Sequence, residues 1–320
     1  MARVRAVWVG PNLKETAMSQ QQKDALTEML RNAPLDIGGD AIEERANFEK
    51  MLSAQPLADD VSTTAGELGG VPVLNIETVD ANHDAVMLWF HGGWYVIGSP
   101  RTSAGLSSDL ARRVDAKVIS VDYRLAPEHP YPAALQDATA AYRGLLDSGV
   151  DPRSIAIVGE SAGGGLAVAL LASLAENGLA QPAAAFLLSP WTDLTLSGET
   201  MASMVGIDPV FTREKVSVRA ADYVGSADPA DPSISPIFAD LHGLSPILIQ
   251  VGSHEILLDD SISLARRAAI DDVDITLDVT PGVPHGFQAF AAMLEEGDAA
   301  LTRAAAFLDH HLSRAEATTR

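Results

Sequence analysis

The sequence predicts an α/β fold in which helices cover both faces of a mostly parallel, doubly wound sheet. Two observations favour this class: short apolar runs recur from about residue 70 onward, and a helical segment follows most of them. Strands that are covered on both faces are apolar throughout, and their alternation with helices is typical of parallel sheets. The predicted strands are Val71–Val79, Ala85–Phe90, Lys117–Val121, Ile155–Val158, Ala183–Leu188, Ile247–Val251 and Ile275–Val279.

Helices are predicted both between these strands and ahead of them. Residues 14–55 read as helices because Leu26, Met29 and Leu30 recur at helical spacing, with no strand signal in that stretch. Pro132 stands at the start of a further helix, where its missing N–H is tolerated. The helices predicted among the strands are Ala133–Leu146, Ala162–Ala175, Ser261–Ala269 and Ala291–Leu312.

The alternation of strands and helices stops between Asp193 and Asp231, where the pattern is again helical. We therefore predict a helical cap in two pieces, residues 1–60 and 195–230, over a core in two parts, residues 61–194 and 231–320. Open α/β sheets bind ligands at the carboxyl ends of their strands. Catalytic residues are expected directly after the predicted strands.

Charge and composition exclude several classes of partner. The chain of 320 residues has a net charge of −21, from 43 acidic and 22 basic residues, which disfavours nucleic acid and anionic membranes. It has no Cys, so disulfides and thiolate chemistry are excluded. No apolar stretch approaches the ~20 residues of a spanning helix, and the N-terminal one is too short for a secretory signal. A cytoplasmic location is expected.

The segment Gly159-Glu-Ser-Ala-Gly163 lies between a predicted strand and a predicted helix. In that context G-x-S-x-G is the nucleophile elbow, in which a sharp turn projects the Ser hydroxyl above the sheet. The flanking glycines avoid Cβ clashes with neighbouring backbone. The helix N-terminus places an amide beside the developing oxyanion. We predict Ser161 as nucleophile and Ala162 as one oxyanion donor.

A second loop, His91-Gly92-Gly93-Trp94, directly follows the strand Ala85–Phe90. Acyl transfer develops a negative oxygen that needs preorganised N–H donors, and consecutive glycines let the backbone turn its amides toward it. Gly92 and Gly93 are the predicted further donors, whereas His91 is expected to brace the loop.

A Ser nucleophile needs a base and an acid to orient that base. Of the eight histidines, His285 lies in the loop after the last predicted strand and is the predicted base. Glu255 is the first acidic residue after the strand Ile247–Val251 and is the predicted acid. Asp259 and Asp260 stay open as alternatives, although their place at a helix start suits capping.

Together these motifs resemble the hormone-sensitive-lipase-like esterases, the bacterial family IV carboxylesterases. The resemblance implies the α/β-hydrolase fold with an eight-stranded core and a split helical cap. It also implies hydrolysis of short-acyl esters, with lactones and acetyl esters among the candidate substrates. It also implies no cofactor or metal and frequent homodimers. The segments that carry it are His91–Trp94 with Gly98-Ser99, Asp122–Ala133, Gly159–Gly164, Asp231–Pro236 and His285–Phe287.

Two residues depart from the family pattern. Trp94 replaces the third glycine of the usual His-Gly-Gly-Gly, which should narrow or reshape the pocket mouth. Glu255 replaces the usual Asp, which keeps Asp259 open as the acid. The expected substrate pocket consists of Trp94, Met204, Val205 and Ile256, an apolar lining suited to small aliphatic acyl groups.

Two alternatives of other classes use the same fold. A ligand receptor that has lost catalysis would lack the base, whereas His285 is present. A peptidase or amidase with the same triad would be distinguished by comparing ester and amide turnover. No propeller-like domain for selecting peptides is present in the sequence.

Overall fold

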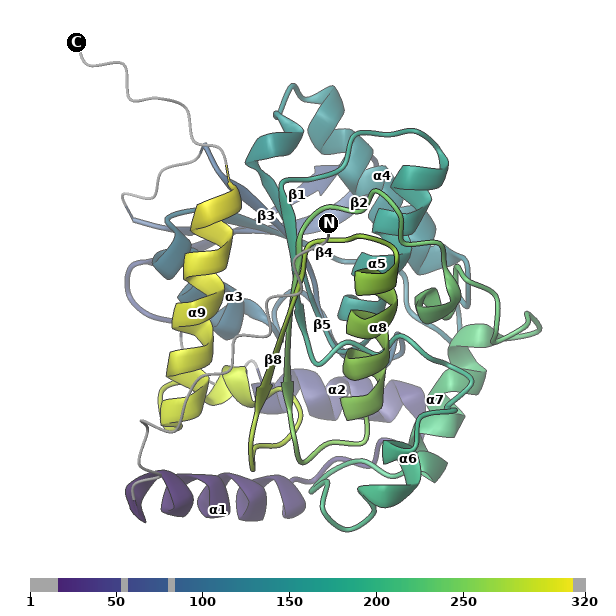
Figure 1. Cartoon of the computed structure of the whole chain (residues 1–320). Coiled ribbons are helices and arrows are strands. Elements are labelled where there is room, and N and C mark those ends of the chain that lie inside the picture. The colour runs from purple at the N-terminus through teal and green to yellow at the C-terminus, as the bar shows by residue number, and fades with distance from the viewer. Residues whose placement is uncertain (1–16, 53–56, 80–83, 313–320) are drawn as a thin grey trace.

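The structure is a computed structural model that describes residues 17–52, 57–79 and 84–312. The described residues form an eight-stranded sheet in the order β1-β2-β4-β3-β5-β6-β7-β8 (Figure 1). The pairs β1–β2 and β2–β4 are antiparallel and all later neighbours are parallel. The strands are β1 (Val61–Leu68), β2 (Val71–Thr78), β3 (Val86–Phe90), β4 (Lys117–Val121), β5 (Ile155–Glu160), β6 (Ala184–Leu188), β7 (Ile247–Gly252) and β8 (Ile275–Thr280).

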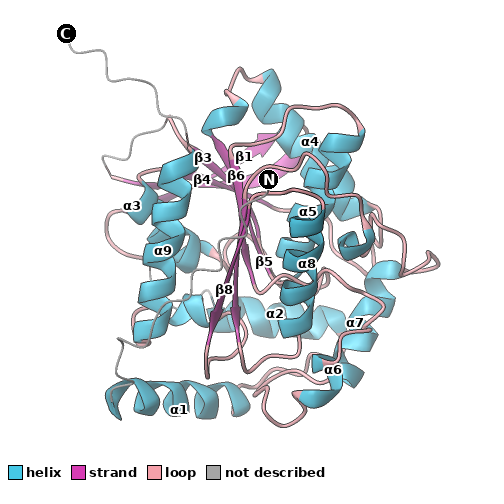
Figure 2. Ribbon diagram, in the orientation of Figure 1, coloured by secondary structure: helices cyan, strands magenta, loops and turns pink. Residues whose placement is uncertain are grey.

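Helices cover both faces of the sheet, as the sequence predicted (Figure 2). Side chains of α3 and α9 pack on one face, and side chains of α4, α5 and α8 pack on the other. The helices are α1 (Ala17–Arg31), α2 (Ala41–Leu52), α3 (Ala104–Val114), α4 (Ala133–Asp147), α5 (Ala162–Glu176), α6 (Thr200–Ser203), α7 (Arg213–Val224), α8 (Leu258–Ile270) and α9 (Glu295–His311).

The burial of the central strands explains why apolar runs in the sequence predicted them. Every residue of β3 and β6 is buried, because helices exclude water from both sides of these strands. All seven predicted strands are present, with ends shifted by one or two residues. The predicted mostly parallel α/β fold is therefore confirmed.

Two elements were not predicted from the sequence, and one helix begins later than expected. Strand β1 is an edge strand whose inner six positions are exposed, so it lacks an apolar run. Helix α3 is short and carries serines among its buried residues. Helix α9 begins at Glu295 rather than Ala291, because the 3₁₀ turn Phe287–Phe290 precedes it and acidic residues occupy its first turn.

Helices α1, α2, α6 and α7 gather at one end of the sheet (Figure 1). Helix α2 contacts the loops that follow β3 and β4, since Arg45 donates to the carbonyl oxygens of Val96 and Ala126, each at 2.6 Å. The segment 195–230, which we call the insertion, packs on the chain around α1 and α2. Arg31 donates to Gly206 O at 3.2 Å, and Arg219 donates to Gly39 O at 3.1 Å.

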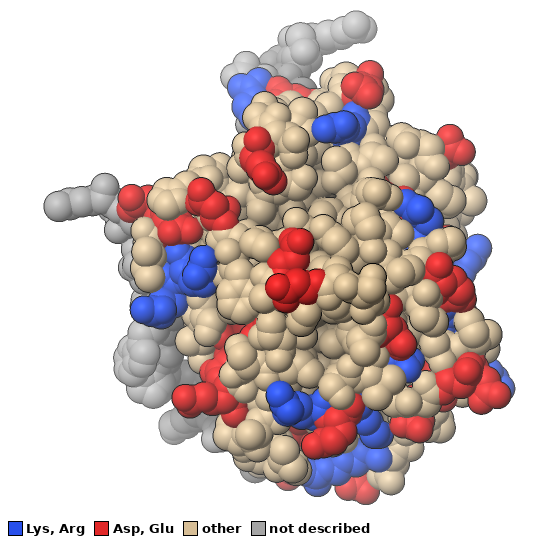
Figure 3. All heavy atoms as spheres, turned by 90° about the vertical axis from the view of Figure 1, so that its right-hand side faces the viewer, with Lys and Arg blue, Asp and Glu red and all other residues tan. Residues whose placement is uncertain are grey.

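One face of the surface can be followed in the space-filling view. On the face shown in Figure 3, acidic and basic side chains are interspersed among uncharged residues. Among the described residues, no helix is long and apolar enough to span a bilayer. Residues 1–16 and 53–56 of the predicted cap piece 1–60 lie outside the described residues.

Candidate active site

Ser161 occupies a strained turn between β5 and α5. Its φ of 54° and ψ of −118° form a combination that non-glycine residues rarely adopt and that is typical of functional turns. The turn is held because Ser161 N donates to Leu188 O at 2.8 Å and Ser161 O accepts from Trp191 N at 2.9 Å. The hydroxyl forms no hydrogen bond within the described part of the chain, which is common for nucleophiles without a bound substrate.

The loop after β3 lies against this turn. A Cβ on Gly163 would meet Phe90 O at 2.1 Å, so the glycine lets the start of α5 approach the end of β3. Gly93 and Trp94 have positive φ values of 122° and 61°. The loop therefore turns sharply where the sequence predicted amides aimed at an oxyanion.

The Gly92 amide makes a hydrogen bond that the sequence did not predict. It donates to Glu160 Oε1 at 3.0 Å, and the same oxygen accepts a short hydrogen bond from the Ser103 hydroxyl. The role of Gly92 as an oxyanion donor stays a prediction, beside this hydrogen bond to Glu160. In the described residues, neither Gly93 N nor Trp94 N donates to another protein group.

His285 and Glu255 form a buried pair. His285 Nδ1 lies 2.6 Å from Glu255 Oε2, with 12% of the His285 side chain and none of the Glu255 side chain exposed. Glu255 Oε1 accepts from the Ser189 hydroxyl at 2.8 Å and from Gly252 N at 2.7 Å. The carboxylate is thus fixed by two donors while its second oxygen faces the imidazole.

Three carboxylates act on His285. Burial by itself lowers the pKa of His285, but the charge of Glu255 and its hydrogen bond, with further contributions from Asp208 and Glu160, raise that pKa above its ordinary value. Burial raises the pKa of Glu160, against hydrogen bonds from Ser103 and Gly92. Burial likewise raises the pKa of Asp208, although hydrogen bonds from three backbone amides lower it in part.

The two alternative acids point elsewhere. Asp259 Oδ2 accepts from Thr200 N at 3.0 Å. Asp260 Oδ2 accepts from the amides of Thr192 and Asp193 at 2.7 and 2.8 Å. Both carboxylates bind backbone amides, and neither contacts His285, which leaves Glu255 as the carboxylate paired with that imidazole.

Aromatic rings surround the His285 imidazole. The Trp94 ring stacks at 6.2 Å and 19° on the imidazole, and the Phe211 ring meets it edge-on at 5.0 Å and 77°. Trp94 and Phe211 also contact each other at 4.5 Å between ring centroids. These two side chains place apolar ring surface against the imidazole.

The other expected pocket residues have mixed outcomes. Val205 is 61% exposed, and its place in the pocket stays a prediction. Met204 packs against the main core, and Ile256 is fully buried in the loop next to Glu255. Their place in the pocket stays a prediction.

Sequence reasoning missed Glu160, Ser189, Asp208 and Phe211. Glu160 is the second residue of the elbow motif, a position that the motif itself leaves unspecified. Asp208 and Phe211 lie in the insertion, where no motif marks a contact with the distant His285. Only the folded chain brings these residues to the site.

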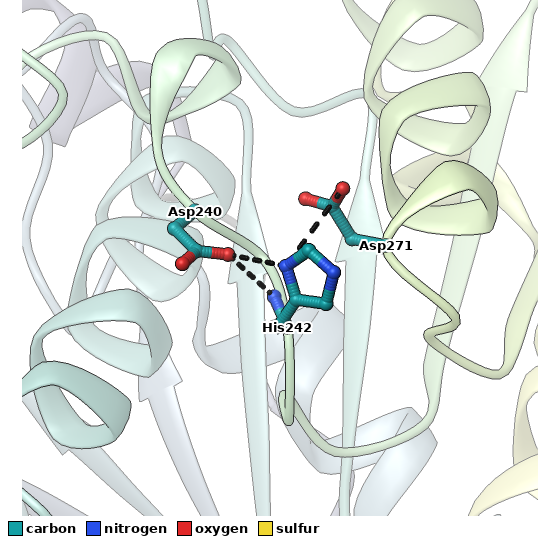
Figure 4. A group of neighbouring side chains, drawn as sticks. All are labelled: Asp240, His242 and Asp271. Atoms are coloured by element: carbon teal, nitrogen blue, oxygen red, sulfur yellow. Dashed lines mark hydrogen bonds and ion pairs between the residues drawn. The ribbon is translucent and has the colours of Figure 1, made fainter.

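One group of possible metal ligands occurs among the described residues, away from Ser161. Asp240, His242 and Asp271 place a nitrogen and two carboxylate oxygens within 4.8 Å of one another (Figure 4). His242 Nδ1 lies 2.6 Å from Asp240 Oδ1, and this local hydrogen bond accounts for the arrangement. We assign no metal to this exposed group.

The chain is similar in sequence and fold to known proteins. The family model described as alpha/beta hydrolase fold matches residues 87–289. The chain belongs to the α/β-hydrolase family. The structure of this hydrolase superimposes on the crystal structure of an esterase from the bacterial hormone-sensitive lipase family with a TM-score of 0.88. The two sequences are 42% identical, and the match covers 92% of this chain and 99% of that one.

Curated relatives of this α/β hydrolase agree with the structural match. An acetyl-hydrolase of Streptomyces hygroscopicus is 40% identical over 222 residues, 69% of this chain and 74% of the relative. An esterase of Acinetobacter venetianus is 40% identical over 234 residues, 72% of this chain and 77% of the relative. The resemblance to the bacterial hormone-sensitive-lipase-like esterases, predicted from the motifs, is confirmed.

Proposed function

We propose that this α/β hydrolase is a serine carboxylesterase that cleaves short-acyl esters through an acyl-enzyme intermediate. The observation that carries the proposal is the buried Glu255–His285 pair, at the same end of the sheet as the strained Ser161 turn. The names of the relatives, an acetyl-hydrolase and an esterase, support the ester class. Acetyl esters and lactones are the natural candidates within it.

In the first step Ser161 Oγ attacks the ester carbonyl while His285 Nε2 takes the hydroxyl proton. Glu255 accepts the Nδ1–H of His285 at 2.6 Å, which fixes the tautomer and stabilises the imidazolium. The imidazolium then gives its proton to the departing alcohol, leaving the acyl group on Ser161. In the second step His285 takes a proton from water, which attacks the acyl-enzyme. The imidazolium then returns its proton to Ser161 Oγ as the acyl–oxygen bond breaks, which releases the acid and restores the free enzyme.

The oxyanion donors proposed here are the amides of Gly93, Trp94 and Ala162. Gly93 and Ala162 keep the roles expected from the sequence, and Trp94 replaces Gly92, whose amide Glu160 binds. The N-terminus of α5 adds a positive dipole end beside Ala162. Each donor contributes on the order of 3 kcal/mol to transition-state stabilisation.

Small acyl groups fit the aromatic surroundings of the base. Trp94 stands where the family pattern has glycine, and its indole lies on His285 and against Phe211. An indole in this position fills space that a glycine would leave to the substrate. We therefore place the preferred substrates among acetyl and other short aliphatic esters.

Three further parts of the proposal come from the sequence. The segments 1–60 and 195–230 act together as a cap, which the contacts of Arg31 and Arg219 across them support. A homodimer and a cytoplasmic location complete the proposal, the latter in keeping with a chain without Cys. Light scattering tests the dimer, and fractionation of the native host tests the location.

The decisive experiment compares hydrolysis of p-nitrophenyl esters from acetate to palmitate by wild type and Ser161→Ala. We expect turnover to peak at short chains and to fall to near background in the variant. If folded Ser161→Ala keeps more than a few per cent of the wild-type rate, the nucleophile assignment is wrong. If folded wild type turns over none of these esters, the short-acyl esterase proposal is wrong.

A further inference from the structure

Asp208 is a buried carboxylate of the insertion that neither the predicted triad nor the oxyanion loop uses. It is 6% exposed and lies between α6 and α7. Its Oδ1 accepts from Val210 N at 2.9 Å and from Phe211 N at 2.8 Å. This oxygen closes a local turn that fixes the backbone of Phe211.

The second oxygen of Asp208 reaches across to a different part of the chain. Asp208 Oδ2 accepts from Ile256 N at 3.0 Å. Ile256 directly follows Glu255, so the insertion binds the peptide unit that adjoins the carboxylate paired with His285. A contact over 48 residues of sequence is a tertiary tie rather than a local turn.

Thr200, also in the insertion, binds the carbonyl oxygen of Ile256. The Thr200 hydroxyl donates to Ile256 O at 2.7 Å and accepts from Asp259 N at 3.1 Å. The insertion therefore grips Ile256 through both its N–H and its carbonyl oxygen. We call this pair of contacts the Ile256 clasp.

Asp208 also bears on the imidazole itself. Phe211, whose amide Asp208 binds, meets His285 at 5.0 Å, and the Asp208 charge raises the pKa of His285. The charged groups that act on His285 are Glu255 from the loop after β7, Glu160 from the elbow and Asp208 from the insertion. Among these, Asp208 alone comes from the segment predicted as a cap.

We propose that Asp208 is a positioning residue that couples the insertion to the His285–Glu255 pair, through the Ile256 clasp on one side and Phe211 on the other. This inference rests on the proposed function of His285 as general base. One oxygen of Asp208 binds the amide of Phe211 and the other binds the amide of Ile256. A displacement of the insertion therefore shifts Phe211 and the loop that carries Glu255 together. A displacement of about 1 Å at such a site costs on the order of a hundredfold in rate.

Asp208→Asn tests the coupling with little change in shape. The Asn carbonyl oxygen can keep the turn to Val210 and Phe211, but the amide group cannot accept from Ile256 N. We expect kcat for p-nitrophenyl acetate to fall about tenfold with KM nearly unchanged. The acid limb of the pH profile should move to lower pH, because one negative charge near His285 is removed.

Two matched variants separate position from charge. Thr200→Val breaks the other half of the clasp without changing charge, so kcat should fall while the acid limb stays in place. Asp228→Asn removes a charge from an exposed turn of the same insertion and should leave both kcat and the acid limb unchanged. If Asp208→Asn does not fold, wild-type kcat in Thr200→Val overturns the inference, and a reduced kcat supports it.

The inference can fail while the proposed function stands. Wild-type kcat and an unmoved acid limb in folded Asp208→Asn overturn it, even if Ser161→Ala is inactive as expected. If wild type hydrolyses no ester, the proposed function fails, and NMR titration of His285, assigned with His285→Gln, replaces the rate measurement. An identical His285 pKa in wild type and Asp208→Asn then overturns the inference, and a lower one supports it.

Discussion

His285 Nδ1 and Glu255 Oε2 lie 2.6 Å apart, although 30 residues separate them along the chain. They meet because β7 and β8 are parallel neighbours, so the loops that follow the two strands leave the sheet at the same edge. Glu255 is held from behind by Ser189 and Gly252. The longer side chain of Glu is thus accommodated where the family pattern has Asp, with the carboxylate still facing the imidazole.

Glu255→Gln should abolish most activity without unfolding the protein. The Gln side chain presents an N–H₂ group or a neutral oxygen to His285 Nδ1, so the correct tautomer is lost or the imidazolium is no longer stabilised. We expect kcat to fall by about 10³-fold or more. Asp259→Asn is the matched control and should stay within a few-fold of wild type. The reverse result would make Asp259 the acid.

Gly93→Ala and Gly92→Ala should differ sharply. A Cβ on Gly93, whose φ is 122°, would lie 2.1 Å from Ile97 O, so the oxyanion loop must move. A Cβ on Gly92 meets the Glu160 side chain at 3.1 Å, where a small shift suffices. We expect kcat to fall on the order of a hundredfold for Gly93→Ala and less than tenfold for Gly92→Ala. Equal losses would contradict the reassigned donors.

Trp94→Gly should widen the range of acyl chains. Removing the indole opens the space beside His285 and Phe211 and restores the residue of the family pattern. We expect kcat/KM for p-nitrophenyl hexanoate to rise about tenfold relative to acetate. The measurement is the chain-length profile of both proteins, with melting temperatures as a check on folding. An unchanged profile would show that Trp94 does not limit the substrate.

The pH dependence of hydrolysis should show a base with a raised pKa. Protonated His285 cannot accept the Ser161 proton, so kcat/KM falls as the pH drops through the pKa of His285. Because the surrounding carboxylates outweigh burial and raise this pKa above 6.5, the acid limb should lie above pH 6.5. Initial rates on p-nitrophenyl acetate from pH 5 to 9, followed by pH-stat, locate it. A limb at or below 6.5 contradicts the prediction.

His91 should make the fold sensitive to acid. Burial lowers the pKa of His91 to about 4 from 6.5, so between these values the unfolded chain binds a proton that the folded chain does not. Stability then rises with pH in this window and falls by about 3 kcal/mol as the pH drops through it. Urea unfolding at pH 7 and pH 4.5 measures the loss.

His91→Asn is the matching variant for that measurement. It can keep the hydrogen bond to Gly92 O that His91 Nδ1 makes at 2.8 Å. The variant should be less stable than wild type at pH 7, since the stacking of His91 on Tyr123 is lost, but its stability should depend less on pH. An unchanged slope between the two pH values would show that His91 is not the group responsible.

Much of the fold could be predicted from the sequence because the central strands are buried on both faces. Such strands are mostly apolar, and β3 and β6 are apolar along their whole length, while β4, β5 and β7 each carry only one or two polar side chains. Strand β1 was not readable, because an edge strand with exposed side chains carries no such constraint. Helix α3 was missed for a related reason, since small polar residues fill several of its buried positions.

Within the site, the sequence predicted those residues whose positions are restricted by backbone geometry or by their order along the chain. The Ser161 turn and the Gly93 loop are marked by local motifs, and Glu255 and His285 by their order after two strands. The contact between Gly92 and Glu160 was not predicted, because nothing in a glycine pair shows which amide a carboxylate from another strand binds. Glu160 makes that choice through a contact across 68 residues.

The sequence by itself determined the α/β fold, the ester-hydrolase motifs and the order of the proposed nucleophile, acid and base, because these follow from local periodicity and turn geometry. The tertiary structure alone decided which acid faces His285, which loop amides are free, and that Asp208 and Phe211 reach the site from the insertion. Those facts depend on contacts between segments far apart in the chain. The physical reason is that local pattern specifies strands and turns, whereas the partner of a buried polar group is set by packing in three dimensions.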